Sequence, residues 1–349
     1  MSNEFKINGR TIGKGHPAYI IAEMSGNHAG SLENAIDIIH AAKEAGADCI
    51  KIQTYTADTL TIDCDNEYFH IDNGTWEGEN LYHLYEKAYT PWDWQPKLME
   101  EAKKVGIDFF STPFDNSSVD FLEEMGVTFY KIASFEIVDI PLLKYVASKQ
   151  KPIIMSTGMS TLEEIEEAVE AIRSMGNNQI ALLRCASAYP AITDEINLNT
   201  MADMAERFDC PTGLSDHSLG SVGAVTAVAL GANIIEKHFC ISREIKNPDS
   251  SFSMEKDEFK SMVRDIRLAE CAVGGVSYGP TEQEKDNVKF RRSVFVTKDI
   301  KKGEKFTEEN IRIIRPGYGM KPKYYPETIG KCATVDIKRG TPLLPEYVE

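Results

Sequence analysis

Eight short apolar segments recur along the chain, and each ends in polar residues that can take part in chemistry. These segments end at residues 23, 53, 112, 134, 157, 185, 217 and 238, and helical patterns separate most of them. Alternating strands and helices predict a parallel sheet. Eight such units in roughly 250 residues are typical of a (β/α)8 barrel, whose catalytic groups gather at the C-terminal ends of the strands. The sequence therefore predicts an α/β fold of the TIM-barrel type, with its active site at that end.

Two helices between these segments carry recognisable end signals. Ser31 precedes a helical pattern that closes at Gly46. Ser160 and Glu163 have the spacing of a capping box, and Gly176 follows the apolar positions of the same pattern. These signals support helices that cover the outside of the barrel.

The C-terminal part of the chain predicts a second, smaller domain. From Lys285 to Glu349 there are 15 Lys and Arg against 9 Asp and Glu, so within a total of −16 the rest of the chain carries −22. A repeat links residues 297–303 (TKDIKKG) with residues 334–340 (TVDIKRG), and each copy ends in a glycine that suits a hairpin turn. We predict a barrel domain over residues 1–284 and a pseudo-symmetric β domain of two related hairpins over residues 285–349, joined by a linker at about residues 274–286. The basic domain either has a solvated surface or helps to hold a polar or anionic ligand.

The composition narrows the setting in which the protein works. The chain has seven cysteines without a C-x-x-C pair, which argues for a reducing compartment. Its N-terminus lacks the apolar core of a signal peptide, and no apolar run is long enough to span a bilayer. The negative net charge disfavours nucleic acid as a partner. We therefore expect a cytoplasmic protein that binds neither nucleic acid nor membrane.

The connection after the second predicted strand is unusually long. About 50 residues separate Gln53 from the next strand, where a few residues on each side of a helix are normal. The stretch is rich in aromatic residues, among them Tyr55, Trp76, Tyr85 and Trp92. Because it leaves the catalytic end of the barrel, a lid is one interpretation; a small subdomain packed on its own aromatic side chains is the other.

His217 and His238 follow the seventh and eighth predicted strands. Neighbouring strands lie about 4.8 Å apart, so the two imidazoles can share one metal ion. A site with two protein ligands leaves positions for water and substrate, which suits a Lewis acid such as Mn, Co or Mg acting on a carbonyl group. Two barrel histidines held by ordinary hydrogen bonds are the alternative.

Lys51 and Lys131 end the second and fourth predicted strands, and unpaired buried ammonium groups are costly. Together with the hydroxyl groups of Ser134, Ser156 and Ser215 they predict a phosphate and carboxylate site. A Schiff-base lysine or two lysines paired with barrel carboxylates are the alternatives. Glu23, at the end of the first strand, is a candidate general acid or base, or a neutralising partner of the lysines.

At these residues the chain resembles the sialic acid synthase family over nearly its whole length. The motifs that carry the resemblance are Glu23-x-x-x-Asn27-His28, Lys51-x-Gln53-Thr54, Ser111-Thr112-Pro113-Phe114, Tyr130-Lys131-Ile132-x-Ser134-x-Glu136, Ser156-Thr157-Gly158-Met159, Tyr189-Pro190, Gly213-Leu214-Ser215-Asp216-His217, Glu236-x-His238-Phe239 and Arg315-Pro316. The repeat-bearing tail resembles the antifreeze-like (SAF) domain of that family. The resemblance implies a metal-dependent enzyme that condenses phosphoenolpyruvate with an open-chain acetamido sugar and releases phosphate.

The resemblance also implies residue roles. The metal ligands would be His217 and His238, with Mn as the expected ion and Co or Mg as alternatives, and the acid or base would be Glu23. The residues that bind phosphoenolpyruvate would be Lys51, Thr112, Lys131, Ser134, Ser156 and Ser215. The residues that contact the sugar would be Gln53, Glu136, Tyr189, Asp249 and Arg315. Arg315 would come from the partner chain of a homodimer with swapped C-terminal domains.

Within the family, the chain looks most like the pseudaminic acid synthase branch. It has Asn73-Gly74-Thr75-Trp76 where enzymes for N-acetylmannosamine have Pro-Gly-Asn-Ala. It has Cys185-Ala186-Ser187-Ala188 where they have Cys-Thr-Asn-x. The expected sugar is a diacetamido-trideoxy-altrose, which an aromatic lid suits. Synthesis of N-acetylneuraminate or legionaminate from another acetamido sugar is the first alternative, and a non-catalytic sugar-binding barrel is the second.

Overall fold

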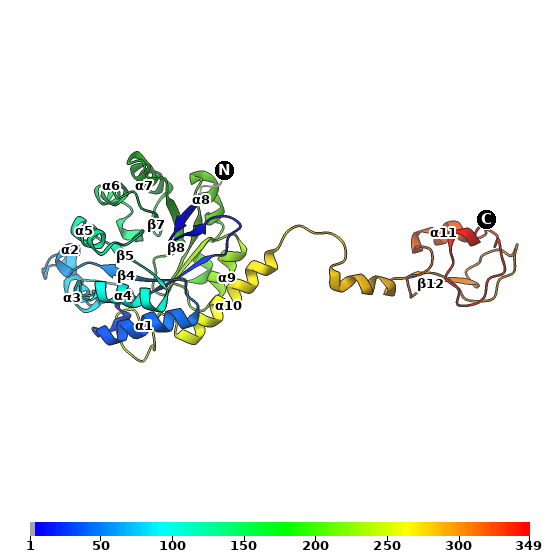
Figure 1. Ribbon diagram of the computed structural model, residues 1–349, viewed down its shortest axis with the longest axis horizontal. Helices are drawn as coiled ribbons and strands as arrows, with labels where there is room; N and C mark the ends of the chain where they lie inside the picture. Colours follow the sequence, from blue (N-terminus) through cyan, green and yellow to red (C-terminus); the bar gives the residue numbers. More distant parts are fainter. Residues whose placement is uncertain (1–3) are drawn as a thin grey trace. The chain divides into compact units, whose positions relative to one another are not determined.

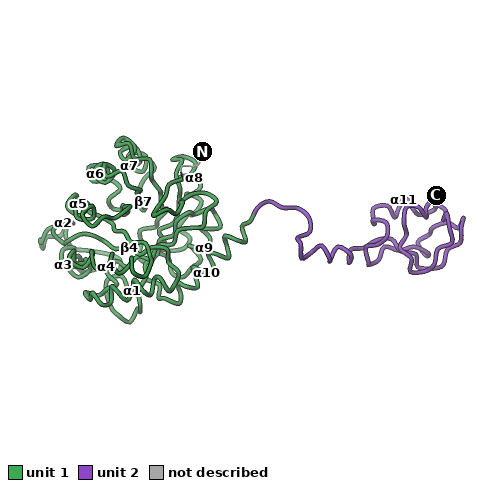
Figure 2. The backbone as a smooth tube through the Cα atoms, in the orientation of Figure 1, with its two compact units in different colours: residues 1–274 green, residues 275–349 purple. Residues whose placement is uncertain are grey.

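The computed structural model describes residues 4–349 and divides the chain into two compact units, one up to Gly274 and the other from Gly275 to Glu349 (Figure 2). The boundary expected from the sequence, between residues 284 and 285, lies ten residues further along. The segment expected to be a linker begins where the helix α10 (Lys256–Val273) ends, and it includes the start of the 3-10 helix η5 (Glu282–Phe290).

The first unit contains a closed barrel of eight parallel strands, which confirms the predicted fold (Figure 1). Its strands are β3 (Tyr19–Glu23), β4 (Cys49–Thr54), β5 (Asp108–Pro113), β6 (Tyr130–Ile132), β7 (Ile153–Ser156), β8 (Ile180–Cys185), β9 (Thr212–Asp216) and β10 (Ile234–His238). They pair in chain order, and β10 closes the barrel by pairing with β3. The eight apolar segments of the sequence are these eight strands.

Each barrel strand alternates between two surroundings, because successive side chains of a strand point to opposite faces. On β4, Cys49 joins the apolar cluster inside the barrel, whereas Ile50 and Ile52 join the cluster beneath the helices. The same period of two directs Lys51 and Gln53 inward. Charged groups therefore enter the barrel only towards the C-terminal end of this strand.

Helices surround the strands in the ribbon view (Figure 1). In chain order the first unit has α1 (Leu32–Ala45), α2 (Ala57–Leu60), α3 (Leu81–Ala88), α4 (Gln95–Val105), α5 (Asn116–Met125), α6 (Ile140–Ser148), α7 (Leu162–Ser174), α8 (Thr200–Phe208), α9 (Val222–Ala229) and α10. Short 3-10 helices follow several strands: η1 (Ser25–His28), η2 (Glu67–Phe69), η3 (Ser134–Glu136) and η4 (Thr193–Glu195). The helix α1 packs beside α4 and α10.

The helix ends follow the sequence signals with one shift. Ser31 caps α1, and Gly46 ends it in the left-handed conformation that glycine favours. The capping box of α7 is formed by Thr161 and Glu164, one residue later than the predicted pair of Ser160 and Glu163. Both registers have a hydroxyl residue three positions before a glutamate, so the spacing alone does not separate them.

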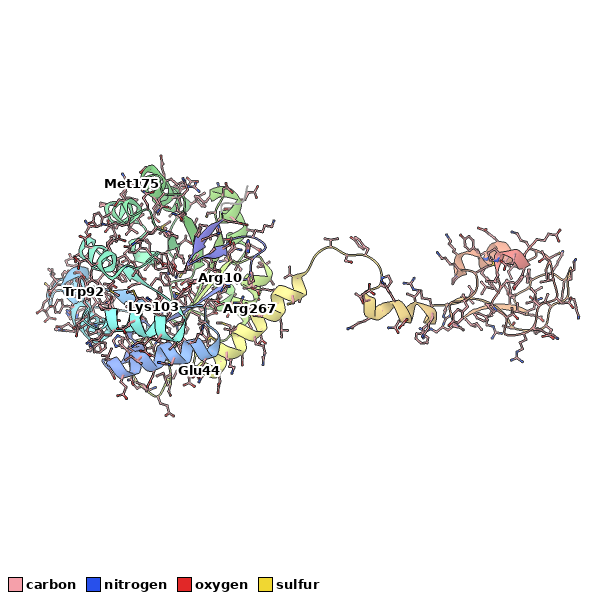
Figure 3. The ribbon with its side chains drawn as sticks, viewed as in Figure 1. Arg10, Glu44, Trp92, Lys103, Met175 and Arg267 are labelled. Carbon is pink, nitrogen blue, oxygen red and sulfur yellow. The ribbon has the colours of Figure 1, made fainter. Side chains whose placement is uncertain are left out.

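A two-stranded hairpin closes the other end of the barrel. The strand β1 (Phe5–Ile7) pairs with β2 (Arg10–Ile12), and its apolar side chains join the cluster inside the barrel. Arg10 of this hairpin and Arg267 of α10 (both labelled in Figure 3) donate to the Asp48 carboxylate just before β4. This end of the barrel is thus closed by apolar packing and tied to α10 by charge-assisted hydrogen bonds.

The second unit is a small β domain in which the two repeat copies pair with each other. Its strands β11 (Ser293–Val296) and β12 (Ile311–Ile314) are antiparallel, and its short helices are η6 (Pro322–Tyr324), α11 (Tyr325–Thr328) and η7 (Pro345–Tyr347). Ile300 of one copy and Ile337 of the other exchange two backbone hydrogen bonds of 2.8 Å. The two predicted hairpins are therefore wrong: Gly303 and Gly340 do adopt positive φ in turns, but the bridge at the repeat joins one copy to the other.

The structure has no helix, within residues 4–349, that is both long enough and apolar enough to cross a membrane.

Candidate active site

The C-terminal ends of the barrel strands gather a dense set of buried polar side chains. They are Glu23, Lys51, Thr112, Lys131, Ser156, Ser215, His217, Glu236 and His238, all less than 9% exposed. Each lies on or directly after a different strand, or two residues from its neighbour on the same strand, so the inward period of two delivers all of them to one space. Polar groups buried together in this way need one another, or a ligand, as partners.

Glu236 of β10 is at the centre of this set. Its Oε1 accepts hydrogen bonds from Nζ of Lys131 at 2.8 Å and from Oγ of Ser215 at 3.3 Å, and it lies 2.9 Å from Nζ of Lys51. Glu236 belongs to one of the sequence motifs but had no predicted role. Its position two residues before His238 on the same strand was the available signal, because it places Glu236 on the inward face.

The pKa values of the two glutamates of the site are shifted in opposite directions. Burial raises the pKa of Glu23 to about 7, and the Glu236 carboxylate adds to the rise, although Lys51 opposes it. Burial alone would also raise the pKa of Glu236, but the ammonium groups of Lys131 and Lys51 outweigh it and hold that pKa well below its usual range. Two carboxyl groups with separated pKa values suit an acid or base role for one and a fixed negative charge for the other.

The two lysines also differ. Burial opposes the charge of Lys51, but Glu23 and Glu236 nevertheless raise its pKa above the usual value. For Lys131 burial prevails, and its pKa is lowered even though Glu236 pairs with it. Both lysines are thus paired with carboxyl groups inside the barrel, Lys131 with Glu236 and Lys51 with Glu236 and Glu23, as one alternative from the sequence expected.

The expected hydroxyl groups line the same space. Thr112 Oγ1 accepts from Nζ of Lys51 at 3.5 Å, and Ser134 Oγ accepts from the backbone N–H of Gly158 at 3.1 Å. Ser156 Oγ is buried without a hydrogen-bond partner among residues 4–349. A side chain at Gly158 would collide with the hydroxyl groups of Ser134 and Ser187, which explains the glycine there. A buried hydroxyl without a partner is expected where a ligand supplies one.

His217 and His238 lie side by side, with ring centroids 5.4 Å apart. Nδ1 of His217 lies 3.1 Å from the carbonyl oxygen of Ala186, which can only accept, so Nδ1 carries a proton. Burial opposes a charge on this ring, but the neighbouring Cys185 nevertheless raises the pKa of His217 above its usual value. Nδ1 of His238 is buried without a hydrogen-bond partner among the described residues. Burial, reinforced by the neighbouring His217, lowers the pKa of His238 well below its usual value. A tautomer fixed by a backbone carbonyl and a neutral, unpartnered ring nitrogen fit a metal site.

No group of three or more His, Cys, Asp or Glu side chains within residues 4–349 is arranged to hold a metal ion. An ion held by the two imidazoles would therefore need water and substrate in its remaining positions.

The residues expected to contact the sugar surround these groups, with one exception. Nε2 of Gln53 donates to Oε1 of Glu23 at 3.0 Å, and the ring of Tyr189 lies 4.2 Å, centroid to centroid, from that of His217. The Asp249 carboxylate accepts from the backbone N–H of Gly26 at 2.8 Å, and burial raises the pKa of this aspartate. The exception is Arg315, which lies outside the barrel unit.

Burial raises the pKa of Glu136 to about 7, and its Oε2 has no hydrogen-bond partner among the described residues. The residue is half-buried, and this carboxyl group is available to a ligand. Arg315 belongs to the other unit, where it follows β12 and has an exposed side chain. Its role at this site stays a prediction.

An aromatic group covers the two histidines. Trp76, from the long connection between β4 and β5, contacts Tyr189 with a centroid distance of 5.5 Å and Phe252 with one of 6.3 Å. Phe252 in turn lies 5.0 Å from the ring of His238. Phe252 was not predicted as a site residue, because the loop after β10 carries no motif that marks it.

The rest of the long connection packs elsewhere. Tyr55 contacts Tyr85 and Phe114, and Trp92 stacks on Phe121 of α5 with centroids 4.8 Å apart. Trp76 thus packs on the two rings that contact the histidines, while these other aromatic residues hold the segment together.

Comparisons with known proteins agree with this geometry. A model of the NeuB family matches residues 38–278, and a model of the SAF domain matches residues 291–349. The chain is 47% identical to the pseudaminic acid synthase of Campylobacter jejuni subsp. jejuni serotype O:2 over 93% of this chain and 95% of that protein. It is 36% identical to the N,N'-diacetyllegionaminic acid synthase of Legionella pneumophila over all of both chains. Among solved structures, the N-acetylneuraminic acid synthetase of Leptospira borgpetersenii serovar Hardjo-bovis superimposes with a TM-score of 0.73 at 32% identity, covering 82% of this chain and 96% of that one.

Proposed function

This chain belongs to the NeuB family, and we propose that it is a pseudaminic acid synthase, which condenses phosphoenolpyruvate with a diacetamido-trideoxy-altrose. C3 of phosphoenolpyruvate forms a bond to the aldehyde carbon of the open-chain sugar, and water adds at C2. The bond between C2 and the phosphate oxygen then breaks, which releases phosphate and leaves a nine-carbon keto acid. The observation that carries the proposal is one buried space that holds two lysines, a carboxyl group of raised pKa and two adjacent imidazoles.

Phosphoenolpyruvate binds where the lysines meet Glu236. Lys51 and Lys131 pair with its phosphate and carboxylate groups, and Thr112, Ser134, Ser156 and Ser215 add hydrogen bonds. The support is the two buried ammonium groups that meet at Glu236 and the unpartnered hydroxyl of Ser156. Charge-assisted hydrogen bonds of this kind are about twice as strong as neutral ones.

Glu23 moves the proton. Its Oε1 accepts from Gln53, which fixes the carboxyl group, while its Oε2 accepts no hydrogen bond from the described residues and lies 3.3 Å from Nζ of Lys51. With a pKa near 7, Glu23 is present in both protonation states at neutral pH. It can therefore protonate the oxygen of the former aldehyde and take a proton from the water that adds at C2.

His217 and His238 would hold a divalent ion. Mn is the expected ion, and Co or Mg are the alternatives. When bound, the ion supplies Lewis-acid polarisation of the sugar aldehyde. Tyr189, whose ring is tilted against that of His217, and Asp249, Gln53 and Glu136 orient the sugar in the same space.

The sugar assignment rests on two features. The relative named as a pseudaminic acid synthase is more similar to the chain than the relative named for legionaminic acid. In addition, Phe252 presents an apolar ring next to His238 and Trp76 packs on Phe252, which favours a sugar with two acetamido groups and fewer hydroxyl groups.

The assembly and the compartment are part of the proposal. The protein acts in the cytoplasm as a homodimer in which the SAF domain of one chain completes the site of its partner. The exposed side chain of Arg315, in a unit separate from the barrel, is the residue that would reach the partner's sugar.

A panel of acetamido sugars, each offered with phosphoenolpyruvate and Mn, tests the proposal by phosphate release and by mass spectrometry of the product. The altrose derivative should give the highest kcat/KM. A preference for the legionaminate precursor or for N-acetylmannosamine would move the chain to that branch of the family. Release of no phosphate with any sugar would favour a non-catalytic sugar-binding barrel.

A further inference from the structure

Directly beside the two histidines, a buried ion pair joins the same two strands on their outward face. Asp216 precedes His217 on β9, and Lys237 precedes His238 on β10. The two residues are partners in the strand register, and Nζ of Lys237 lies 2.8 Å from Oδ2 of Asp216. Their side chains are 1% and 0% exposed, respectively, so the pair is shielded from solvent.

The same pair also holds the backbone that follows His217. Oδ1 of Asp216 accepts the backbone N–H of Ser218 at 2.9 Å and its hydroxyl group at 2.6 Å. Nζ of Lys237 donates to the carbonyl oxygen of Ser218 at 2.6 Å. His217 is therefore held between two residues that are both tied to the residue preceding His238.

The helix α9 packs closely over this group. A Cβ atom at Gly223 would lie 3.1 Å from the Ser218 hydroxyl and 3.2 Å from the Asp216 carboxylate. The close approach of α9 holds the Asp216 carboxylate on the helix side, and β9 holds it on the barrel side.

A buried charged pair is an expensive way to fill this position. Removing two charges from water costs several kcal/mol per ion, and well-packed apolar residues often stabilise a fold as well or better. The preceding outward positions of the same strands are in fact apolar, Leu214 and Ile235, and both are fully buried. The charges therefore have a role that apolar packing does not fill. They fix the direction of the backbone next to the histidines.

We propose that Asp216, Ser218 and Lys237 form a positioning clamp that sets the two imidazoles at the separation a metal ion needs. This rests on the metal role of His217 and His238 in the proposed function. None of the three residues is directed towards the substrate space, so they act through the histidines and are not catalytic residues. Groups that orient metal ligands commonly change metal affinity by about 10- to 100-fold when they are replaced.

The test measures the binding of Mn²⁺ alone to the full chain, by electron paramagnetic resonance, alongside the melting temperature of each variant. Asp216→Asn leaves an unpaired buried ammonium group and should both lower the melting temperature and weaken Mn²⁺ binding. The deciding variant is Asp216→Leu/Lys237→Met, which removes both charges and keeps apolar volume. It should melt close to the wild type and still bind Mn²⁺ about tenfold more weakly or worse. Ser218→Ala, the mildest change, should weaken binding in the same direction.

Asp48→Asn is the matched control, because Asp48 accepts from Arg10 and Arg267 at the opposite end of the barrel (Figure 3). It should lower the melting temperature without changing Mn²⁺ affinity. Wild-type Mn²⁺ affinity in the folded double variant would overturn the clamp while leaving the metal site standing. Unchanged affinity in His217→Ala would overturn the metal site itself, and the clamp with it.

Discussion

The indole N–H of Trp76 donates a hydrogen bond to the carbonyl oxygen of Pro248 at 2.9 Å, and this bond ties the connection after β4 to the loop after β10. The bond holds the Trp76 ring against Tyr189 and Phe252, above the two histidines. One residue of a 50-residue connection thus becomes part of the wall of the site.

Trp76→Phe should lower the preference for the altrose derivative over N-acetylmannosamine. In the intact site, each unpaired hydroxyl group of N-acetylmannosamine costs about 1–3 kcal/mol. The variant loses the bond to Pro248 and with it the fixed apolar surface, so this penalty becomes smaller. The measurement is the ratio of the two kcat/KM values. Trp92→Phe is the control: Trp92 stacks on Phe121 and donates to Tyr55, so it should affect stability and leave the ratio unchanged. An unchanged ratio in Trp76→Phe would make its role purely structural.

Lys131→Met should raise the KM for phosphoenolpyruvate by roughly 10- to 100-fold, because it removes a charge-assisted contact of about 1.5–3 kcal/mol while keeping the volume of the side chain. Steady-state kinetics at saturating sugar measure the effect. Lys144→Met, on the exposed side of α6, should change nothing. Borohydride with either substrate should trap no adduct on Lys51 or Lys131; a covalent adduct would instead identify a Schiff-base enzyme.

The stability of the protein should depend on pH through Glu23. Its pKa of about 7 in the folded state exceeds the value of 4.5 expected when it is exposed, so between these values the folded state binds the extra proton. This contribution to stability is fully present below pH 4.5 and is lost as the pH rises through 7. Glu23→Gln keeps the shape of the side chain without the charge. From pH 5 to pH 8, its melting temperature should therefore rise relative to that of the wild type. The corresponding change in the free energy of unfolding is on the order of 3 kcal/mol.

Glu163→Gln, on the exposed face of α7, is the comparison, because it makes the same substitution away from the site. A flat difference for Glu23→Gln would mean that Glu23 stays ionised throughout this range.

Removal of divalent ions should abolish activity, because the aldehyde then loses its Lewis acid. A chelator followed by dialysis, with Mn or Co added back, is the experiment, and phosphate release is the measurement. His217→Ala should stay inactive after metal is restored. His40→Ala, an exposed histidine paired with Glu101, should recover like the wild type. Full turnover in the presence of chelator would contradict the metal role.

Arg315→Ala should mainly raise the KM for the sugar, because the arginine is expected to contact the sugar and not phosphoenolpyruvate. Arg312→Ala, exposed on β12 three residues earlier, is its control. Mixing Arg315→Ala chains with Glu23→Ala chains tests the exchange of domains, since one site of a hybrid dimer would contain both intact residues. Partial recovery of activity is expected, and its absence would mean that each SAF domain serves its own barrel.

The sequence by itself determined the barrel and most of the site. Strand periodicity, with polar residues at the end of each apolar segment, was sufficient to predict the eight strands and to direct Lys51, Lys131 and His238 into one space, because a closed parallel sheet leaves no other place for them. The motifs were equally informative, and the family assigned from them is confirmed by the matches to the NeuB family and the SAF domain.

Only the tertiary structure decided which groups are partners. Glu236 emerged as the acceptor shared by both lysines because β10 lies across the barrel from β6, a distance that no spacing along the chain expresses. The same holds for the pairing of Ile300 with Ile337, where two copies of a repeat meet each other instead of each folding back on itself. Periodicity fixes the face on which a side chain lies, since that depends on neighbouring dihedral angles; hydrogen bonds and pKa values depend on residues that only the closed fold brings together.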